Sequence, residues 1–187
     1  DLGRRDITIN AIAMGLDGNL ISKGTGLEDI QQGIIRAVSE DAFVEDPLRM
    51  LRAVRFNARY NYGWDENTID LIKKNVHLLS DKSELPKERF LTEFEKMIGK
   101  SDLGRAIKML VELGMYEAIF GIKSKINDYD KFKDARNVAE FAYMMFDNEP
   151  KESIVNLVKN NITNSKDIIS YIQALVLYKD KIENKNI

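Results

Sequence analysis

Four arginines spaced close to one helical turn apart are the residues of this sequence best suited to binding a charged ligand. They are separated by three, three and four residues and are Arg49, Arg52, Arg55 and Arg59. At about 100° per residue they share about a third of a helix circumference, and Asp46 lies one turn before the first. One interpretation is purely structural: Asp46 caps the helix, pairs with Arg49, and leaves the other guanidinium groups in solvent.

A second interpretation is that Asp46 and Arg49 together read a nucleobase. A carboxylate accepts a hydrogen bond from an exocyclic amine, while a guanidinium donates to the neighbouring ring nitrogen. Cytosine and adenine present an amine beside a ring acceptor, whereas uracil and guanine present a carbonyl beside a ring N–H. Such a pair would accept C and A and reject U and G, and Arg52, Arg55 and Arg59 could bind phosphates on the same face.

A second cluster stands near the start of the sequence. Arg4 and Arg5 directly precede a predicted strand and could engage a triphosphate, with Asp6 and Asn10 ordering the turn. A basic pair at an exposed end of the chain would look the same, so this signal is weak alone.

A third cluster, Glu88 and Arg89, follows Pro86 in the first turn of a predicted helix. A glutamate suits the dipole at a helix start, so by itself this cluster indicates structure and not a binding site.

Composition excludes several kinds of chemistry. The 187 residues contain no cysteine and one histidine, so thiolate metal sites, disulfides and paired-histidine zinc motifs are excluded. The net charge of −2 gives no overall attraction to nucleic acid, so any such binding depends on local patches. No apolar run approaches the ~18 residues that cross a membrane.

The elements expected to position these clusters change along the chain from mixed to helical. The first 38 residues carry short apolar runs with turn signals, which predict a helix over 27–32 and strands over 7–13, 19–21 and 34–38. The arginine helix is predicted to start at Asp46-Pro47 and to end at Asn61-Tyr62-Gly63.

Periodic apolar residues predict helices through the remainder of the chain. Three of them cover residues 68–79, 86–99 and 103–120, the last interrupted near Gly114. Three more are expected around residues 138–145, 154–158 and 168–177.

Three motifs occur in order and at suitable separations. They are Arg4-Arg5-Asp6-x-Thr8-x-Asn10-Ala11, then Glu45-Asp46-Pro47-Leu48-Arg49-x-Leu51-Arg52-Ala53-x-Arg55-Phe56, then Glu88-Arg89-x-x-x-Glu93. Over about residues 1–120 the sequence thereby resembles the class II tRNA nucleotidyltransferases, or CCA-adding enzymes, and the closely similar bacterial poly(A) polymerases. The resemblance implies a mainly α fold in which a short α/β remnant of a nucleotidyltransferase head is followed by all-α neck and body helices.

The resemblance also implies boundaries and roles. Residues 1–38 would be the head remnant, 39–98 the neck with its template helix, and 99–187 the body or tail. Asp46 and Arg49 would be the protein template that pairs with CTP and ATP. The supporting residues that the resemblance implies are Arg52 beside the nucleotide, Arg4 at its triphosphate or ribose, Asp6 and Asn10 under the pocket, and Glu88 and Arg89 as a brace of the template helix. Arg55 is added to the nucleotide-binding residues from the spacing of the arginine face alone.

The sequence departs from the family at the metal site. The family holds two Mg2+ ions with a Gly-Gly-x-x-Arg-Asp stretch and an Asp-x-Asp that precede Arg4, but only three residues precede it here. The lone Asp-x-Asp, Asp128-Tyr129-Asp130, falls in a polar stretch expected to be a loop. We therefore expect no catalytic carboxylates or metal ligands in this chain, which would be the C-terminal part of such an enzyme and inactive alone.

A second departure lies in a turn of the head remnant. Ser22-Lys23-Gly24-Thr25-Gly26 stands where the family usually shows Asp-Pro-Phe-Gly-Gly, which puts that turn in doubt.

The expected partners are CTP or ATP and the 3′ end of a tRNA or another RNA, in a cytoplasmic protein with no membrane segment. The motifs do not distinguish CCA-, CC-, A- and poly(A)-adding activities. A non-catalytic helical RNA-binding module on the same scaffold is the alternative from another class.

Overall fold

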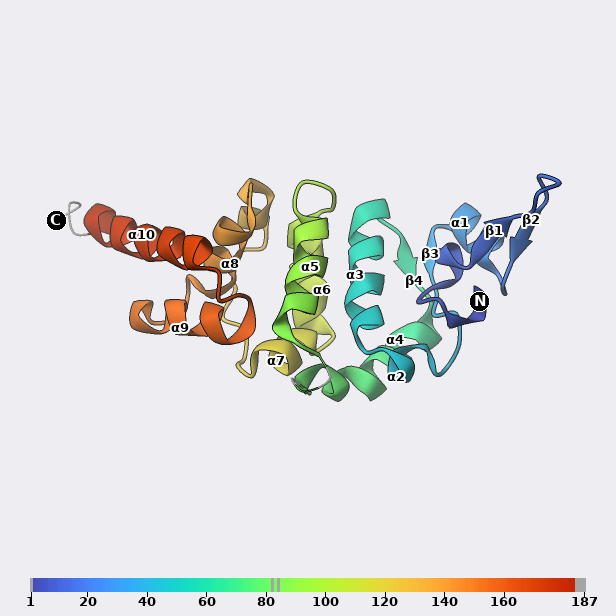
Figure 1. Ribbon diagram of the computed structural model, residues 1–187, viewed down its shortest axis with the longest axis horizontal. Coiled ribbons are helices and arrows are strands. Elements are labelled where there is room, and N and C mark those ends of the chain that lie inside the picture. The colour runs from blue at the N-terminus through green and yellow to red at the C-terminus, as the bar shows by residue number, and fades with distance from the viewer. Residues whose placement is uncertain (1, 82, 84, 184–187) are drawn as a thin grey trace.

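The computed structural model describes residues 2–81, 83 and 85–183, which form an elongated row of helices (Figure 1). The N-terminal hairpin and its short helix lie at one end, α3 and the α5–α6 pair stand upright in the middle, and α8 to α10 form the other end. The α-helices are α1 Gly26–Gln32, α2 Ala42–Glu45, α3 Leu48–Tyr60, α4 Glu66–Asn75, α5 Lys87–Met97, α6 Leu103–Glu112, α7 Met115–Phe120, α8 Val138–Phe146, α9 Lys151–Asn161 and α10 Lys166–Glu183. The mainly α class predicted from the sequence is confirmed, whereas the three-part division of the chain stays a prediction.

The strands of the described chain are short, three of them before α3 and one directly after it. They are β1 Ile12–Met14, β2 Leu20–Ser22, β3 Ile34–Ile35 and β4 Gly63–Trp64. β1 and β2 form an antiparallel hairpin with Ala13 opposite Ile21, and the turn between them contains Gly18 at a positive φ of 81°. β3 pairs in parallel with β4, which joins the region before α3 to the segment after it.

The strand predicted over residues 7–13 is largely wrong. Ile7 makes only an isolated antiparallel bridge with Ala37, residues Thr8–Asn10 form a 3₁₀ turn, and the hairpin ladder begins at Ile12. The buried Asp6 carboxylate accepts hydrogen bonds from the Ile7 N–H and the Asn10 side chain. These local bonds curl the backbone where alternating apolar residues suggested an extended one. The strand expected over 34–38 is likewise shorter, and β4 was not predicted.

Helix α3 has the limits and the buried side that its sequence predicts. The Asp46 carboxylate accepts the Leu48 N–H at 3.1 Å and so caps the first turn. Asn61 ends the helix in the left-handed conformation, with φ of 55°. The apolar side expected to face the core is buried and consists of Met50, Leu51, Val54 and Ala58.

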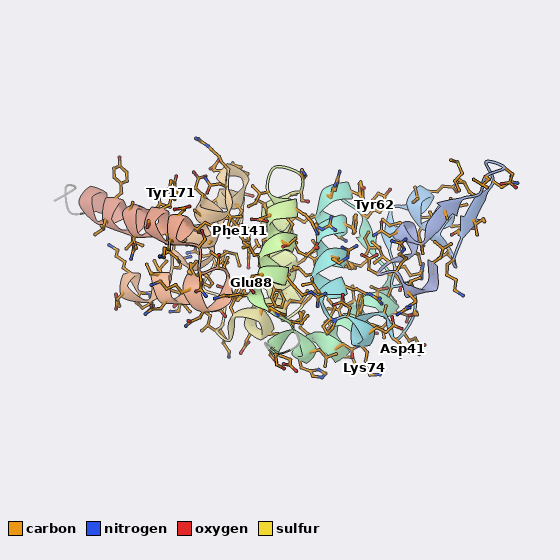
Figure 2. The ribbon with its side chains drawn as sticks, viewed as in Figure 1. Asp41, Tyr62, Lys74, Glu88, Phe141 and Tyr171 are labelled. Atoms are coloured by element: carbon orange, nitrogen blue, oxygen red, sulfur yellow. The ribbon has the colours of Figure 1, made fainter. Side chains whose placement is uncertain are left out.

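The predicted interruption near Gly114 is confirmed, because this glycine adopts a φ of 74° between α6 and α7. The helices beyond it pack around aromatic rings. The Phe141 ring of α8 lies 5.1 Å from that of Phe94 on α5, and the Phe120 ring of α7 lies 5.3 Å from that of Phe146. Figure 2 shows Phe141 between α8 and α5. No helix in the described part of the chain is long and apolar enough to cross a membrane.

Candidate nucleotide-binding cleft

A cleft of about 420 Å³ opens where the N-terminal turn, the start of α3 and the start of α5 meet. Its walls carry five arginines and three carboxylates, a mixture that favours a polar, anionic ligand. The lining residues are Arg4, Arg5, Asp6, Asp46, Leu48, Arg49, Arg52, Arg89, Thr92 and Glu93. The structure therefore brings residues of all three sequence motifs into one cleft.

Asp46 lies just before the start of α3, and its carboxylate accepts hydrogen bonds from Arg89 of α5. The Arg89 Nη2 donates to both carboxylate oxygens, at 2.9 and 3.1 Å. The two side chains are 41% and 30% exposed, so this ion pair lies at the surface and contributes little to stability. The Asp46 carboxylate thus keeps its cap on α3 and stays accessible from the cleft.

Arg49 does not pair with Asp46, contrary to the structural interpretation of their spacing. Its guanidinium donates to the Glu45 carboxylate at 2.9 Å, to the Ala42 carbonyl at 3.0 Å, and to the Arg4 carbonyl at 2.7 Å. These three contacts fix the group in one orientation. Asp46 and Arg49 are therefore held by separate partners, and neither satisfies the other.

A buried carboxylate anchors the opposite wall. Asp6 accepts from Arg52 Nε at 2.7 Å and from the Asn10 amide at 3.0 Å. Burial raises the pKa of the Asp6 carboxyl, but the hydrogen bond of Asn10 and the charge of Arg52 outweigh it, and the pKa lies below its ordinary value. The other end of the Arg52 guanidinium lies 3.6 Å from Glu93. Arg52 consequently joins the N-terminal turn to α5 across the floor of the cleft.

Known proteins resemble this chain in both sequence and fold. A CCA-adding enzyme of Ligilactobacillus salivarius is 34% identical over 203 residues, which cover 100% of this chain and 48% of the relative. The structure of the Bacillus stearothermophilus CCA-adding enzyme in complex with CTP is 28% identical, with a TM-score of 0.75, over 97% of this chain and 47% of that one. A structure of a CCA-adding enzyme with ATP is 25% identical, with a TM-score of 0.73, over 92% of this chain and 45% of that one.

A sequence model described as "Probable RNA and SrmB- binding site of polymerase A" matches residues 64–123. Over the region that it spans, this chain belongs to the CCA-adding enzyme family. The chain spans about half the length of these relatives.

The spacing of the arginines in this CCA-family sequence placed Arg55 on the open face of α3, but in the structure its side chain is buried. It is 6% exposed, and its Nε donates to Glu93 at 2.8 Å. Its guanidinium also lies 4.2 Å from the centre of the Phe56 ring. The arginine face is therefore not uniformly open, because Arg55 turns toward α5 and packs there. This burial corrects the expectation that Arg55 contacts a phosphate.

Glu93 is the cleft residue that sequence reasoning quoted but did not assign. It is buried, and besides Arg55 it accepts from Lys96 at 2.8 Å. Burial raises the pKa of its carboxyl, yet the Lys96 hydrogen bond and the Arg55 charge bring the pKa below its usual value. The signal was present in the sequence, since Glu93 follows Arg89 by one helical turn and shares its face.

The two residues expected to brace the template helix separate in the structure. Arg89 contacts Asp46, whereas the Glu88 side chain is exposed and makes no hydrogen bond or ion pair with the described residues. Figure 2 marks Glu88 on α5. Of the two, Arg89 is therefore the residue that contacts the start of α3, and Glu93 is a buried residue one turn further along α5.

The residues that the structure describes do not form a Mg2+ site. Among the described residues, no three histidine, cysteine, aspartate or glutamate side chains are arranged to hold a metal ion. The Asp128 carboxylate accepts the Asp130 N–H at 2.9 Å, a turn within the loop before the 3₁₀ segment Asp130–Asp134. We therefore assign no metal-dependent step to these residues.

Proposed function

We propose that this chain is the base-selecting part of an enzyme that adds C and A from CTP and ATP to the 3′ end of tRNA. The observation that carries the proposal is the cleft in which Asp46 and Arg49 stand one helical turn apart, held by different partners and surrounded by arginines. The named relatives support it, because two similar structures contain CTP and ATP.

Base selection follows from the polarity of the two side chains. The Asp46 carboxylate only accepts hydrogen bonds, and the Arg49 guanidinium only donates them. Cytosine and adenine offer an amine donor beside a ring acceptor, so both satisfy the pair. Uracil and guanine would oppose acceptor to acceptor and donor to donor, which costs about 1–3 kcal/mol for a bidentate contact, or about 5- to 150-fold in affinity.

The remaining cleft residues would hold the nucleotide in place. Arg4 and Arg5 line the cleft from the N-terminal turn and would meet the phosphates, which guanidinium groups bind through paired hydrogen bonds. Arg52 keeps the floor rigid through Asp6, which Asn10 supports. Arg89 adds positive charge beside Asp46 and would move only slightly to release one carboxylate oxygen to the base amine.

Transfer of the nucleotide would need groups outside these residues. Phosphoryl transfer of this kind uses carboxylate-bound divalent ions, which supply charge stabilisation when present. We propose that Mg2+ is held by parts of the enzyme other than the described residues. The chain alone is then expected to bind CTP and ATP without incorporating them into RNA.

The test is nucleotide binding by this chain and by Asp46→Ala. We expect CTP and ATP to bind more tightly than UTP, by about 5- to 150-fold, and we expect Asp46→Ala to abolish most of that difference. The control is Lys108→Ala, an exposed residue of α6 that does not line the cleft. Equal discrimination against UTP by wild type and Asp46→Ala would contradict the template assignment.

A chimaera tests the transfer step separately. The matched region of the L. salivarius enzyme would be replaced by this chain while that enzyme's flanking residues are retained. We expect labelled CTP and ATP to be incorporated by the chimaera and not by the chain alone. Incorporation by the chain alone would show that its own residues carry out the transfer.

A poly(A)-adding activity is the second candidate, and it is favoured by the polymerase A description of the model that matches residues 64–123. The same cleft accepts adenine in both cases. A chimaera that extends RNA with A alone, and never with C, would favour this second activity.

A further inference from the structure

The exposed side of α3 continues past the nucleotide cleft toward the C-terminal end of the helix. Arg49 and Arg52 line the cleft, and the helical period places Phe56, Arg59 and Tyr60 on the same side. Tyr60 lies about 12 Å along the helix axis from Arg52, at a rise of about 1.5 Å per residue. Phe56, Arg59 and Tyr60, here called the aromatic stripe, therefore extend the floor of the cleft.

The rings of the aromatic stripe are stacked on one another. Phe56 and Tyr60 lie nearly parallel, with centroids 6.1 Å apart and an interplanar angle of 12°. The ring of Tyr62, which Figure 2 places beside β4, lies 5.5 Å from Tyr60 at 39°. Tyr60 is 46% exposed. The stripe thus offers an aromatic surface whose outer part is open to a further planar group.

The charge of Arg59 distinguishes it from the other three arginines of the helix. Arg49, Arg52 and Arg55 each pair with a carboxylate. Arg59 is exposed, and with the residues that the structure describes it forms no hydrogen bond or ion pair. Its guanidinium lies 5.6 Å from the centre of the Tyr60 ring. An uncompensated cation therefore stands directly beside the exposed ring.

We infer that the aromatic stripe binds the unpaired 3′ end of the RNA acceptor. Surfaces that hold single-stranded RNA combine aromatic rings, on which bases stack, with cations that meet the phosphates. The stripe has both and is continuous with the cleft, where the RNA end must meet the nucleotide. This inference rests on the proposed function, which supplies the reason for an RNA end to reach Asp46 and Arg49. A protein partner has no backbone phosphates to bind the unpaired Arg59 guanidinium.

The experiment compares two labelled RNA hairpins with the same stem, one blunt and one with a short unpaired 3′ extension. Affinity is measured by fluorescence anisotropy on this chain and its variants. We expect wild type to prefer the extended hairpin, and Tyr60→Ala to bind it about 5- to 20-fold more weakly. Tyr60→Phe should retain the preference, because it keeps the ring. Blunt-hairpin affinity should be the same for all three.

Arg59→Gln tests the phosphate contact independently of stacking. Each lost phosphate contact to a single strand should reduce the slope of log affinity against log salt by about 0.7. Tyr60→Ala should leave this slope unchanged. The control for an exposed tyrosine is Tyr178→Ala on α10, where the side chain is 65% exposed, and Arg136→Ala is the control for an exposed arginine. Neither control should alter the slope or the preference for the extension.

Three results would overturn the inference: no preference for the extension by wild type, equal binding by Tyr60→Ala and Tyr178→Ala, or an equal loss for both hairpins. CTP and UTP binding by the same proteins tests the cleft separately. If Tyr60 controls binding of the extension but CTP is not preferred over UTP, the stripe is an RNA site and the proposed base selection is wrong.

Discussion

In the cleft, contacts between distant parts of the chain are made by charged side chains, whereas in the helical body they are made by aromatic rings. Asp6 meets Arg52 and Asp46 meets Arg89 across the cleft. In the body the Phe94 ring of α5 lies 5.1 Å from the Phe141 ring of α8. Burying apolar area is strongly favourable, while an ion pair gains little beyond the cost of removing its charges from water. The body can therefore supply the stability that a polar binding cleft needs.

The largest effect that this comparison predicts is on stability in the body. Phe141 is fully buried against Phe94 and Phe132. Phe141→Ala should lower the free energy of unfolding by about 4 kcal/mol, since it removes a buried ring and leaves a cavity. Urea denaturation measures this loss. Leu177→Ala on α10, where the side chain is exposed, should change it by less than about 0.5 kcal/mol.

The nucleotide preference of the folded protein is the second readout for Phe141→Ala. It should stay as in wild type, because Phe141 does not line the cleft. If discrimination between CTP and UTP fell along with stability, the two regions would be coupled. The body could then not be treated as a source of stability separate from the cleft.

A smaller loss is expected when a buried charge of the cleft loses its partner. Glu93→Ala would leave the buried Arg55 guanidinium without its carboxylate, at a cost of about 3 kcal/mol. Lys96→Ala removes a half-exposed partner of the same carboxylate and should cost about 0.5 kcal/mol. Thermal unfolding of both variants checks the difference. Similar shifts in Tm would mean that Arg55 is not the partner that matters.

Local sequence signals predict where some helices begin and end, whereas contacts between distant residues are seen only in the structure. The limits of α3 follow from local signals, because Asp46-Pro47 starts the helix and Asn61 ends it. The break at Gly114 is equally local. The gathering of Asp46, Arg89 and Arg4 was expected only through the resemblance to a known family, since no local rule joins residues so far apart.

The sequence predictions that differ from the structure share one physical origin. Arg55 looked like its neighbours in spacing, and only its contact with Glu93, 38 residues away, buries it. β4 is two residues long and exists because β3 lies beside it. The 3₁₀ turn at Thr8–Asn10 depends on the buried Asp6 carboxylate. In each case a contact distant in sequence, or a buried polar group, overrides the local pattern.

The smallest predicted effect is the change in the free energy of unfolding with pH, which is at most about 1.4 kcal/mol per pH unit for each group. Its direction differs between the two regions. In the cleft the pKa values of Asp6 and Glu93 lie below their ordinary values. Their contribution is present above the unfolded values of about 3.9 and 4.3 and is lost as pH falls through the lower folded values. In the body, burial raises the pKa of Tyr116, whose hydroxyl donates to the Met145 carbonyl.

The body should therefore lose stability at the opposite end of the pH range. The unfolded chain ionises this tyrosine above about pH 10 while the folded protein keeps it protonated, so stability falls as pH rises from there. Urea denaturation at about pH 2 to 5 and at about pH 9 to 11 measures both arms. Asp6→Asn should flatten the acid arm alone, because it removes a titrating group of the cleft, and Tyr116→Phe should flatten the alkaline arm alone. If either variant changed both arms, the two regions would not titrate independently.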